Sequence, residues 1–250
     1  MAVSIKSARE IELMREAGKR LAHVHQELEA MITPGISTWE IDAKGEKLIR
    51  DCGCIPNFLH YNGYPASICV SVNDEVVHGI PRKDRYLKEG DIVSLDAGLI
   101  YMGYHSDAAR THAVGKVSTE AQKLMDVTKQ SFFEGIKMAK EGQHLHDISR
   151  AIEEYVTPYG YGIVRDLVGH GIGTALHEDP QIPNYAQKRR GVRLQAGMTL
   201  AIEPMINAGT WQVRFLRDGW TVVTKDGSLS AHYENTILVT DGEPEILTLY

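Results

Sequence analysis

The spacing of apolar residues in the first part of the chain predicts a long amphipathic helix. The apolar stripe consists of Ile11, Met14, Leu21, Leu28 and Ile32. Ser7 and Glu10 fit a capping box, in which a serine and a glutamate satisfy free backbone amides at a helix start. Pro34-Gly35 is a strong stop signal, so we expect the helix to run from this box to that turn.

A second, shorter helix is predicted directly afterwards. Ser37 and Glu40 have the spacing of another capping box. The apolar residues Ile41, Leu48 and Ile49 follow, and Gly53 is a natural helix end.

The same order of elements returns later in the chain. We expect a helix from about Thr119 to Lys140 that ends at Gly142. A shorter helix carries Ile148, Ile152 and Tyr155 and ends near Gly160. A shift of 107 residues superposes four pairs, which are Met31 on Met138, Gly35 on Gly142, Ile41 on Ile148 and Gly53 on Gly160. Identity is low, so the matched order of elements carries more weight than any single pair.

The shift continues into two predicted strands. Residues 89–96 fall on residues 196–203, which places Asp96 on Glu203. After a longer loop in the second half, the segment ending in Asp107 resembles the one ending in Glu234. We interpret this as an internal duplication within one domain, residues 1–250, with α+β halves of about 7–115 and 116–250.

Composition narrows the class of protein. The 250 residues are 43% hydrophobic and carry a net charge of −6, which disfavours specific nucleic-acid binding. The basic run at residues 188–193 is interpreted as a solvated loop. Three cysteines make no disulfide framework, and no signal segment or apolar membrane span is evident, so we expect a cytoplasmic protein without a membrane partner.

Two acids of the first half are predicted to lie on one face of a hairpin. A two-residue loop at Met102-Gly103 places Asp107 opposite Gly98. Side chains alternate along a strand, so Gly98 shares a face with Asp96. The two carboxylates then lie diagonally adjacent and repel each other unless a cation is present.

Three further residues extend this acidic pair into a metal-site hypothesis. Glu203 and Glu234 form the corresponding pair of the second half, and His170 lies in the glycine-rich run 169–173. Four carboxylates and one imidazole carry too much charge for one divalent ion, which favours two ions of Mn, Fe, Co or Zn. The alternative is that these are surface acids at strand ends. The apolar neighbours Leu95 and Ala97 of Asp96 weaken it.

At these residues the chain closely resembles the type I methionine aminopeptidases. The matching stretches are residues 61–65, 71–81, 96–107, 169–173, 202–204 and 232–234. The resemblance implies the pita-bread fold, with two pseudo-symmetric halves of antiparallel sheet covered by helices. It also implies a dinuclear metal site formed by Asp96, Asp107, His170, Glu203 and Glu234, with Asp107 and Glu234 bridging.

The resemblance implies roles for further residues. Glu203 would accept a proton from water, and His78 and His177 would contact the substrate and the developing intermediate. The residues implied to line a methionine pocket are Tyr61, Tyr64, Cys69 and Trp220. The alternatives are a structural His78, a buried thiol at Cys69 and ordinary packing of Trp220. A hairpin that turns at Asp226-Gly227 would place Gly219 opposite Glu234 and bring Trp220 near the metals.

The expected function is removal of the initiator methionine from nascent chains, with a small second residue preferred. Rival interpretations are an inactive pita-bread binding module and a related Xaa-Pro aminopeptidase. We expect nascent N-termini as partners, transient ribosome association and a monomer. Asn62 and Leu176 depart from the common family residues, a histidine and an aromatic, and bear on the pocket wall. The Met1-Ala2 start matches the preference for a small second residue, so we expect the mature protein to begin at Ala2.

Overall fold

The computed structural model describes residues 3–249, and the expectation about Met1-Ala2 therefore lies outside the described residues. The helices are α1 (Ala8–Glu29), α2 (Thr38–Asp51), α3 (Thr119–Ile136) and α4 (Leu145–Val156), with short 3-10 turns at Tyr61–Gly63 and Thr157–Tyr159. No helix in this part of the chain has the length and apolar character needed to cross a membrane.

The strands make up one large sheet and two small ones. The strands of the first half are β1 (Ile55–Pro56), β2 (Ile68–Val72), β3 (Glu75–Val77), β4 (Ile92–Tyr101) and β5 (Tyr104–Ala113). Those that follow α4 are β6 (Gly162–Ile163), β7 (Gly169–Gly171), β8 (Glu178–Ile182), β9 (Thr199–Ile202) and β10 (Met205–Asn207). The last ones are β11 (Val213–Phe215), β12 (Val222–Thr224), β13 (Ser230–His232), β14 (Glu234–Leu238) and β15 (Glu245–Ile246).

The predicted helix starts are confirmed, but two predicted ends are wrong. The side chains of Ser7 and Ser37 accept the backbone amides of Glu10 and Glu40, and both capping boxes are complete. Helix α1 ends at Glu29, before the predicted stop. Helix α3 ends at Ile136 rather than near Lys140, because residues 140–142 bond the backbone of Thr240 and Leu194 instead.

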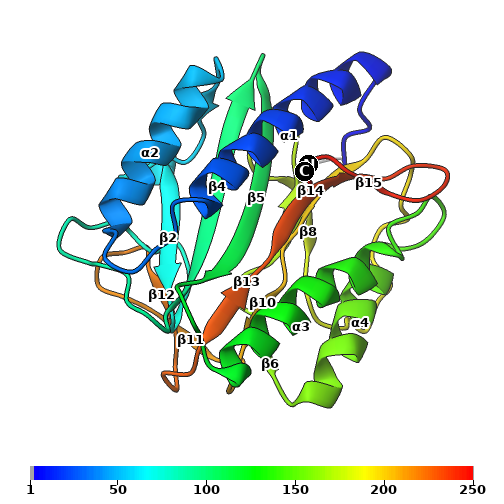
Figure 1. Ribbon diagram of the computed structural model, residues 1–250. Helices are drawn as coiled ribbons and strands as arrows, with labels where there is room; N and C mark the ends of the chain where they lie inside the picture. Colours follow the sequence, from blue (N-terminus) through cyan, green and yellow to red (C-terminus); the bar gives the residue numbers. More distant parts are fainter. Residues whose placement is uncertain (1–2, 250) are drawn as a thin grey trace.

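The large sheet joins the two ends of the chain. Its strands follow the order β1-β4-β5-β14-β9-β7-β8, with antiparallel pairing throughout. The junction is the pair β5–β14, where Ala109 faces Glu234. Strands from before α3 therefore lie on one side of this junction, and strands from after α4 lie on the other (Figure 1).

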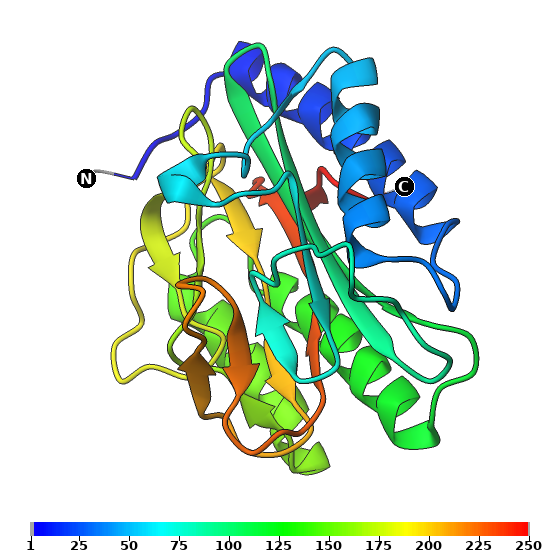
Figure 2. The same cartoon turned by 90° about the vertical axis from the view of Figure 1, so that its left-hand side faces the viewer.

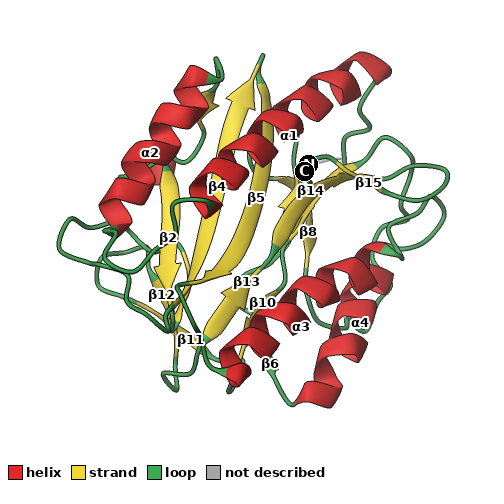
Figure 3. Cartoon of the chain, viewed as in Figure 1, coloured by secondary structure: helices red, strands yellow, loops and turns green. Residues whose placement is uncertain are grey.

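The helices cover one face of this sheet, as the α+β prediction required. Helix α1 packs on β4 and β5, α2 on β2, and α3 with α4 near β13, β10 and β8 (Figure 3). One apolar core fills the space under α1 and α2, and a second fills the space under α3 and α4. From the side, α1 and α2 lie to the right of the sheet, and the orange segment around β11 and β12 lies to the left (Figure 2). The face away from the helices is left for the small sheet β11-β12-β3 and for the site.

A buried histidine of α1 generates a pH-dependent stability. His25 has no exposed surface, and its Nε2 lies 2.8 Å from the backbone oxygen of Ala108. Burial lowers the pKa of His25 well below its usual value, and the charges of Arg110 and His112 lower it further. The unfolded chain therefore takes up this proton first as the pH falls.

We predict that stability present above pH about 6.5 is lost as the pH falls, by about 1.4 kcal/mol per pH unit for this one group. The His25→Gln variant lacks this proton uptake, so its free energy of unfolding should depend less steeply on pH between about 6.5 and 5. Urea unfolding of both proteins over this range measures the difference. Equal slopes would contradict the assignment.

Candidate functional site

The register of the sheet places the acids of the first half beside one acid of the second. The β4–β5 hairpin pairs Gly98 with Asp107 and Asp96 with Ala109, as the two-residue turn predicted. On the next strand Glu234 pairs with the same Ala109. Residues that face each other across a sheet share a face, so all three carboxylates project from one side.

The other two residues reach the same face from β9 and β7. Asn235 pairs with Ile202, so Glu203, one residue further, is level with Glu234. His170 pairs with Ala201, which shares its face with Glu203. The Nε2 atom of His170 lies 3.6 Å from Glu203 Oε1 and 3.9 Å from Asp107 Oδ2.

The acids are buried without enough partners. Asp96, Asp107 and Glu234 are 9%, 4% and 2% exposed. Among residues 3–249, Asp96 Oδ1, Asp107 Oδ1 and Glu234 Oε1 accept no hydrogen bond. A buried carboxylate oxygen in this state needs a proton or a cation.

Burial and mutual repulsion both raise the pKa values of these acids. Burial raises the pKa of Asp96 to about 7, against the effect of a hydrogen bond with Asp107. Burial and the charges of Asp96 and Glu203 raise the pKa of Asp107 well above its usual value. The pKa values of Glu203 and Glu234 are also raised, first by burial and then by the neighbouring acids.

His170 is arranged to present a lone pair to these acids. Its Nδ1 lies 2.8 Å from the backbone oxygen of Gly171, so Nδ1 carries the proton and donates it there. Burial lowers the pKa of His170 to about 3, with a smaller effect of His177. The ring is therefore neutral, and Nε2 is free to bind a metal. The ligand atoms of Asp107, His170 and Glu234 all lie within 4.8 Å of one another, which fits a divalent ion.

A cavity of about 210 Å³ opens above these acids and contains every predicted site residue. Its lining residues are Phe58, Tyr61, Asn62, Tyr64, Cys69, His78, Asp96, Asp107, His170, Leu176, His177, Glu203, Trp220 and Glu234. Acids and imidazoles form one part of the lining, and aromatic and apolar side chains form the other. Cys69 pairs directly with Asp96 across β2 and β4, which explains how a thiol comes next to the acids. Burial raises the pKa of Cys69 well above its usual value, so it is a neutral thiol.

The imidazoles at the cavity rim are also neutral. Burial lowers the pKa of His78 to about 4, and His177 adds to this effect. The pKa of His177 is lowered by burial as well. The hydroxyl of Tyr61 lies 2.7 Å from His177 Nδ1, and the ring of His170 lies 4.3 Å from that of His177 on centroids. His177 is therefore held by contacts with two side chains.

Trp220 reaches the cavity by a route that the sequence did not predict. Strand β12 pairs with β11 and β3 rather than with the strand of Glu234, so the predicted hairpin pairing is wrong. The Trp220 ring instead packs edge-on against Tyr64, at 5.1 Å, and near His78, at 6.2 Å. The alternative of ordinary packing is only half right, because the ring both packs and lines the cavity.

Two residues near the site escaped the sequence analysis. Phe58 lines the cavity, but it stands in an irregular segment where periodicity gives no information. The side chain of His232 lies beside Glu203 and Glu234, with 3.8 Å from its Nε2 to an oxygen of each. Its position two residues before Glu234 was a usable signal, because alternation puts both side chains on one face.

Comparisons with known proteins agree with this geometry. The model of metallopeptidase family M24 matches residues 12–241. A methionine aminopeptidase of Clostridium acetobutylicum is 54% identical over 247 residues, which is 99% of each chain. The solved methionine aminopeptidase of Thermotoga maritima has a TM-score of 0.97 and 46% identity, with both chains covered completely.

A more distant relative shares the fold but has a different named activity. The Xaa-Pro dipeptidase of Bacillus anthracis has a TM-score of 0.79 and 26% identity, and the match covers 98% of this chain but 61% of that one. These likenesses confirm the expected pita-bread fold. The chain belongs to metallopeptidase family M24, among its methionine aminopeptidases.

Proposed function

We propose that the protein is a metal-dependent methionyl aminopeptidase that removes the N-terminal methionine from nascent proteins and peptides and prefers a small second residue. The observation that carries the proposal is the row of carboxylates at the base of a small cavity with an apolar wall, three of which have a buried oxygen without a hydrogen bond among the described residues. Relatives of 44–54% identity over nearly the whole chain bear the name methionine aminopeptidase. Its substrates would be nascent N-termini in the cytoplasm, met by a monomer during transient ribosome association.

The residues proposed to hold the metal are those whose oxygen and nitrogen atoms converge. Asp96, Asp107, His170, Glu203 and Glu234 would hold two divalent ions of Co, Mn, Fe or Zn, with Asp107 and Glu234 shared between them. When bound, such ions lower the pKa of an attacking water and polarise the substrate carbonyl.

Protein groups would carry the proton and hold the substrate. Glu203 accepts the proton of the attacking water and passes it to the leaving amine. His177 is neutral, so one ring nitrogen can donate a hydrogen bond to the carbonyl oxygen as charge develops there. His78 is neutral at the opposite rim and binds the substrate backbone.

The apolar wall is proposed to select methionine. Tyr64, Cys69, Leu176 and Trp220 surround one side of the cavity, together with Phe58. An unbranched thioether adapts to an irregular apolar wall and makes favourable contacts with aromatic rings. Leu176 is buried in this wall, whereas Asn62 is exposed at the mouth, so Leu176 has the greater influence on pocket shape.

The domain organisation is proposed on the same basis. We infer one catalytic domain, residues 1–250, whose halves 7–115 and 116–250 meet at β5–β14. The continuous sheet and the even contribution of acids, two from each half, support it. An inactive binding module is not favoured, because it has no use for crowded acids whose buried oxygens lack hydrogen bonds within residues 3–249. An Xaa-Pro peptidase is not favoured either, because identity to the Xaa-Pro dipeptidase is 26%, against 46–54% for the methionine aminopeptidases named above.

The direct test is release of free methionine from Met-Ala-Ser and Met-Leu-Ser. Purified protein is treated with a chelator and then given Mn, Co, Fe or Zn. We expect metal-dependent release from the alanine peptide and little from the leucine peptide. Folded protein that releases no methionine with any metal would refute the proposed activity.

Crowding of the acids predicts that one substitution stabilises the metal-free protein. Asp107→Asn removes a buried charge that Asp96 and Glu203 repel, so the chelated variant should be more stable than the chelated wild type by about 0.5–2 kcal/mol. Metal should stabilise the wild type more than the variant. Thermal unfolding with and without Co²⁺ measures both effects.

The matched control is Asp51→Asn, since Asp51 is an exposed acid of α2 that pairs with Lys47. This variant should change stability by less than about 0.5 kcal/mol and leave the metal response intact. A metal-free Asp107→Asn protein that is less stable than the wild type would show that repulsion between the acids does not govern the stability of the metal-free site.

The Tyr61–His177 hydrogen bond predicts a coupled kinetic effect. Tyr61→Phe keeps the ring but removes the hydroxyl 2.7 Å from His177 Nδ1, so kcat should fall about 3- to 10-fold, as for the loss of one hydrogen bond. In a His177→Ala background the same change should have no further effect, because the partner is gone. Steady-state kinetics of the four proteins test this.

Tyr159→Phe is the control, because the Tyr159 hydroxyl donates to that of Tyr155 at the surface, away from the site. Its kinetic constants should equal those of the wild type. Independent effects of Tyr61→Phe in both backgrounds would assign Tyr61 to the pocket wall alone.

A further inference from the structure

A second imidazole lies against the acids and has no partner of its own. The side chain of His232 is 1% exposed, and among the described residues neither of its ring nitrogens makes a hydrogen bond. Its Nε2 lies 3.8 Å from Glu203 Oε2 and 3.8 Å from Glu234 Oε2. A neutral imidazole buried in this way leaves one donor and one acceptor unsatisfied, which destabilises the protein unless a further group binds there.

The separations around His232 match those around His170. The Nε2 atom of His170 lies 3.6 Å from Glu203 Oε1 and 3.9 Å from Asp107 Oδ2. All four distances are too long for hydrogen bonds. They are slightly longer than the separation of two ligands of one ion, because two atoms each about 2.1 Å from a metal lie roughly 3.0–3.6 Å apart at coordination angles of about 90–120°. A small inward shift of the side chains on metal binding closes the difference.

We propose that His232 is a sixth metal ligand, whose Nε2 binds together with Glu203 and Glu234. The inference rests on the proposed metal centre and adds one residue to it. The ligand atoms of Glu203, His232 and Glu234 lie within 4.8 Å of one another, as do those of Asp107, His170 and Glu234. Glu203 then stands between two imidazoles, with Oε1 toward His170 and Oε2 toward His232.

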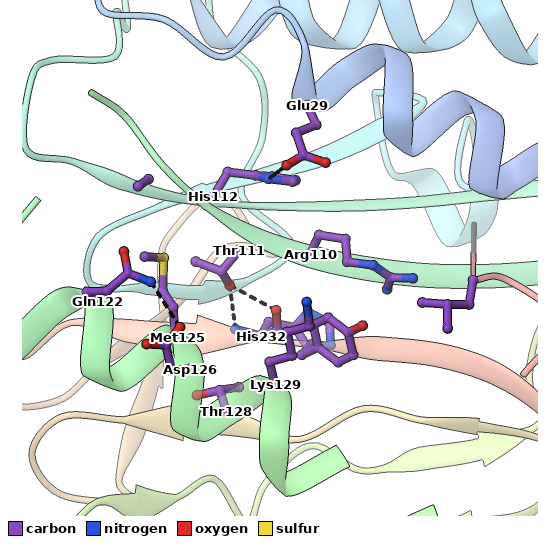
Figure 4. A pocket seen from close by; sticks show the side chains of 13 residues that line it. Glu29, Arg110, Thr111, His112, Gln122, Met125, Asp126, Thr128, Lys129 and His232 are labelled. Atoms are coloured by element: carbon purple, nitrogen blue, oxygen red, sulfur yellow. Dashed lines mark hydrogen bonds and ion pairs between the residues drawn. The ribbon is translucent and has the colours of Figure 1, made fainter. Parts of the chain in front are cut away.

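The backbone holds His232 in this position from both sides. Its amide donates to Thr111 Oγ1 at 2.9 Å, and the same hydroxyl donates to the His232 carbonyl at 2.9 Å (Figure 4). On the other side, His232 pairs with Met205 in the β10–β13 ladder. Because its backbone is fixed by two neighbouring strands, the His232 side chain is held in an orientation suited to metal binding.

The alternative is an ordinary core histidine, and His25 shows what one looks like here. His25 is equally buried, but its Nε2 has the carbonyl oxygen of Ala108 at 2.8 Å. His232 has no such partner and faces two acids instead. Figure 4 shows His232 at the edge of a second cavity, of about 480 Å³, between α1 and α3. The lining of that cavity mixes charged, polar and apolar side chains, including the Glu29–His112 pair, and nothing in it identifies a ligand.

A second imidazole has a chemical consequence for metal choice. Nitrogen ligands favour Co, Ni, Cu and Zn over Mg and Ca, which prefer oxygen. A centre with two imidazoles therefore discriminates against Mg more strongly than a centre with one.

The test counts imidazoles on the metal. Wild type and His232→Gln are loaded with two equivalents of Co²⁺ and studied by X-ray absorption at the cobalt edge. We expect an average of one imidazole per cobalt in the wild type and half of that in the variant. Titration of metal-free protein with Co²⁺ should show one binding step weakened at least about 10-fold. His25→Gln is the matched control and should leave both readouts unchanged.

Each outcome decides the question. An unchanged imidazole count refutes the assignment, and a weaker affinity with that same count would make His232 a hydrogen-bond partner of Glu203. Wild-type protein that binds no cobalt would refute the metal centre itself. Wild-type protein that binds two ions but releases no methionine would refute only the proposed activity. Thermal unfolding of metal-free His232→Gln shows that the variant is folded.

Discussion

Repulsion among four crowded carboxylates, three of them buried, is the constraint on which the rest of the structure depends. The sheet register forces Asp96, Asp107 and Glu234 onto one face, and Glu203 is level with Glu234. The hairpin cannot relax this crowding, because Asp96 is paired with Cys69 on one side and Ala109 on the other, and Asp107 is paired with Gly98. The free energy that compensates comes from the other face, where the helices bury two apolar cores against the same strands.

The groups around the acids show that the chain does not neutralise them itself. The nearby imidazoles have pKa values lowered by burial, to about 3 for His170, about 4 for His78 and about 3 for His232. They are therefore uncharged at neutral pH. Arg110 is close, but it donates to the backbone oxygen of Glu234 and lowers the pKa of that acid least among the causes. A site that pairs charged acids with neutral nitrogens is suited to a cation from outside.

Short-range sequence patterns predicted the helix starts and the hairpin of the site. The features that the sequence analysis missed depend on pairing between segments far apart in the chain. The capping boxes and the two-residue turn depend on neighbours in sequence, so helix starts and the Asp96–Asp107 geometry could be predicted. The pairing of β12 with β3 depends on segments about 145 residues apart in the chain numbering, and no local pattern reports it. The spacing to Glu234 could have placed His232 on the face of the acids, but the structure was needed to distinguish it from a packed histidine such as His25. Among the described residues its ring nitrogens face two acids and make no hydrogen bond, whereas Nε2 of His25 has a backbone oxygen as its partner.

Because side chains alternate along a strand, the same register determines both which residues enter the apolar core and which acids enter the site. In β4 the residues Leu95 and Ala97 enter the core under the helices, while Asp96 between them faces the cavity. A slip of one residue would bury the acid under helix α1 and turn both apolar side chains to the cavity. The turn resists such a slip, because Met102 and Gly103 both have positive φ, of 50° and 86°, and this type of turn suits only a two-residue loop. Met102 adopts that conformation at the surface, with 72% of it exposed, so the turn geometry, and not burial of the Met102 side chain, holds the acids in register.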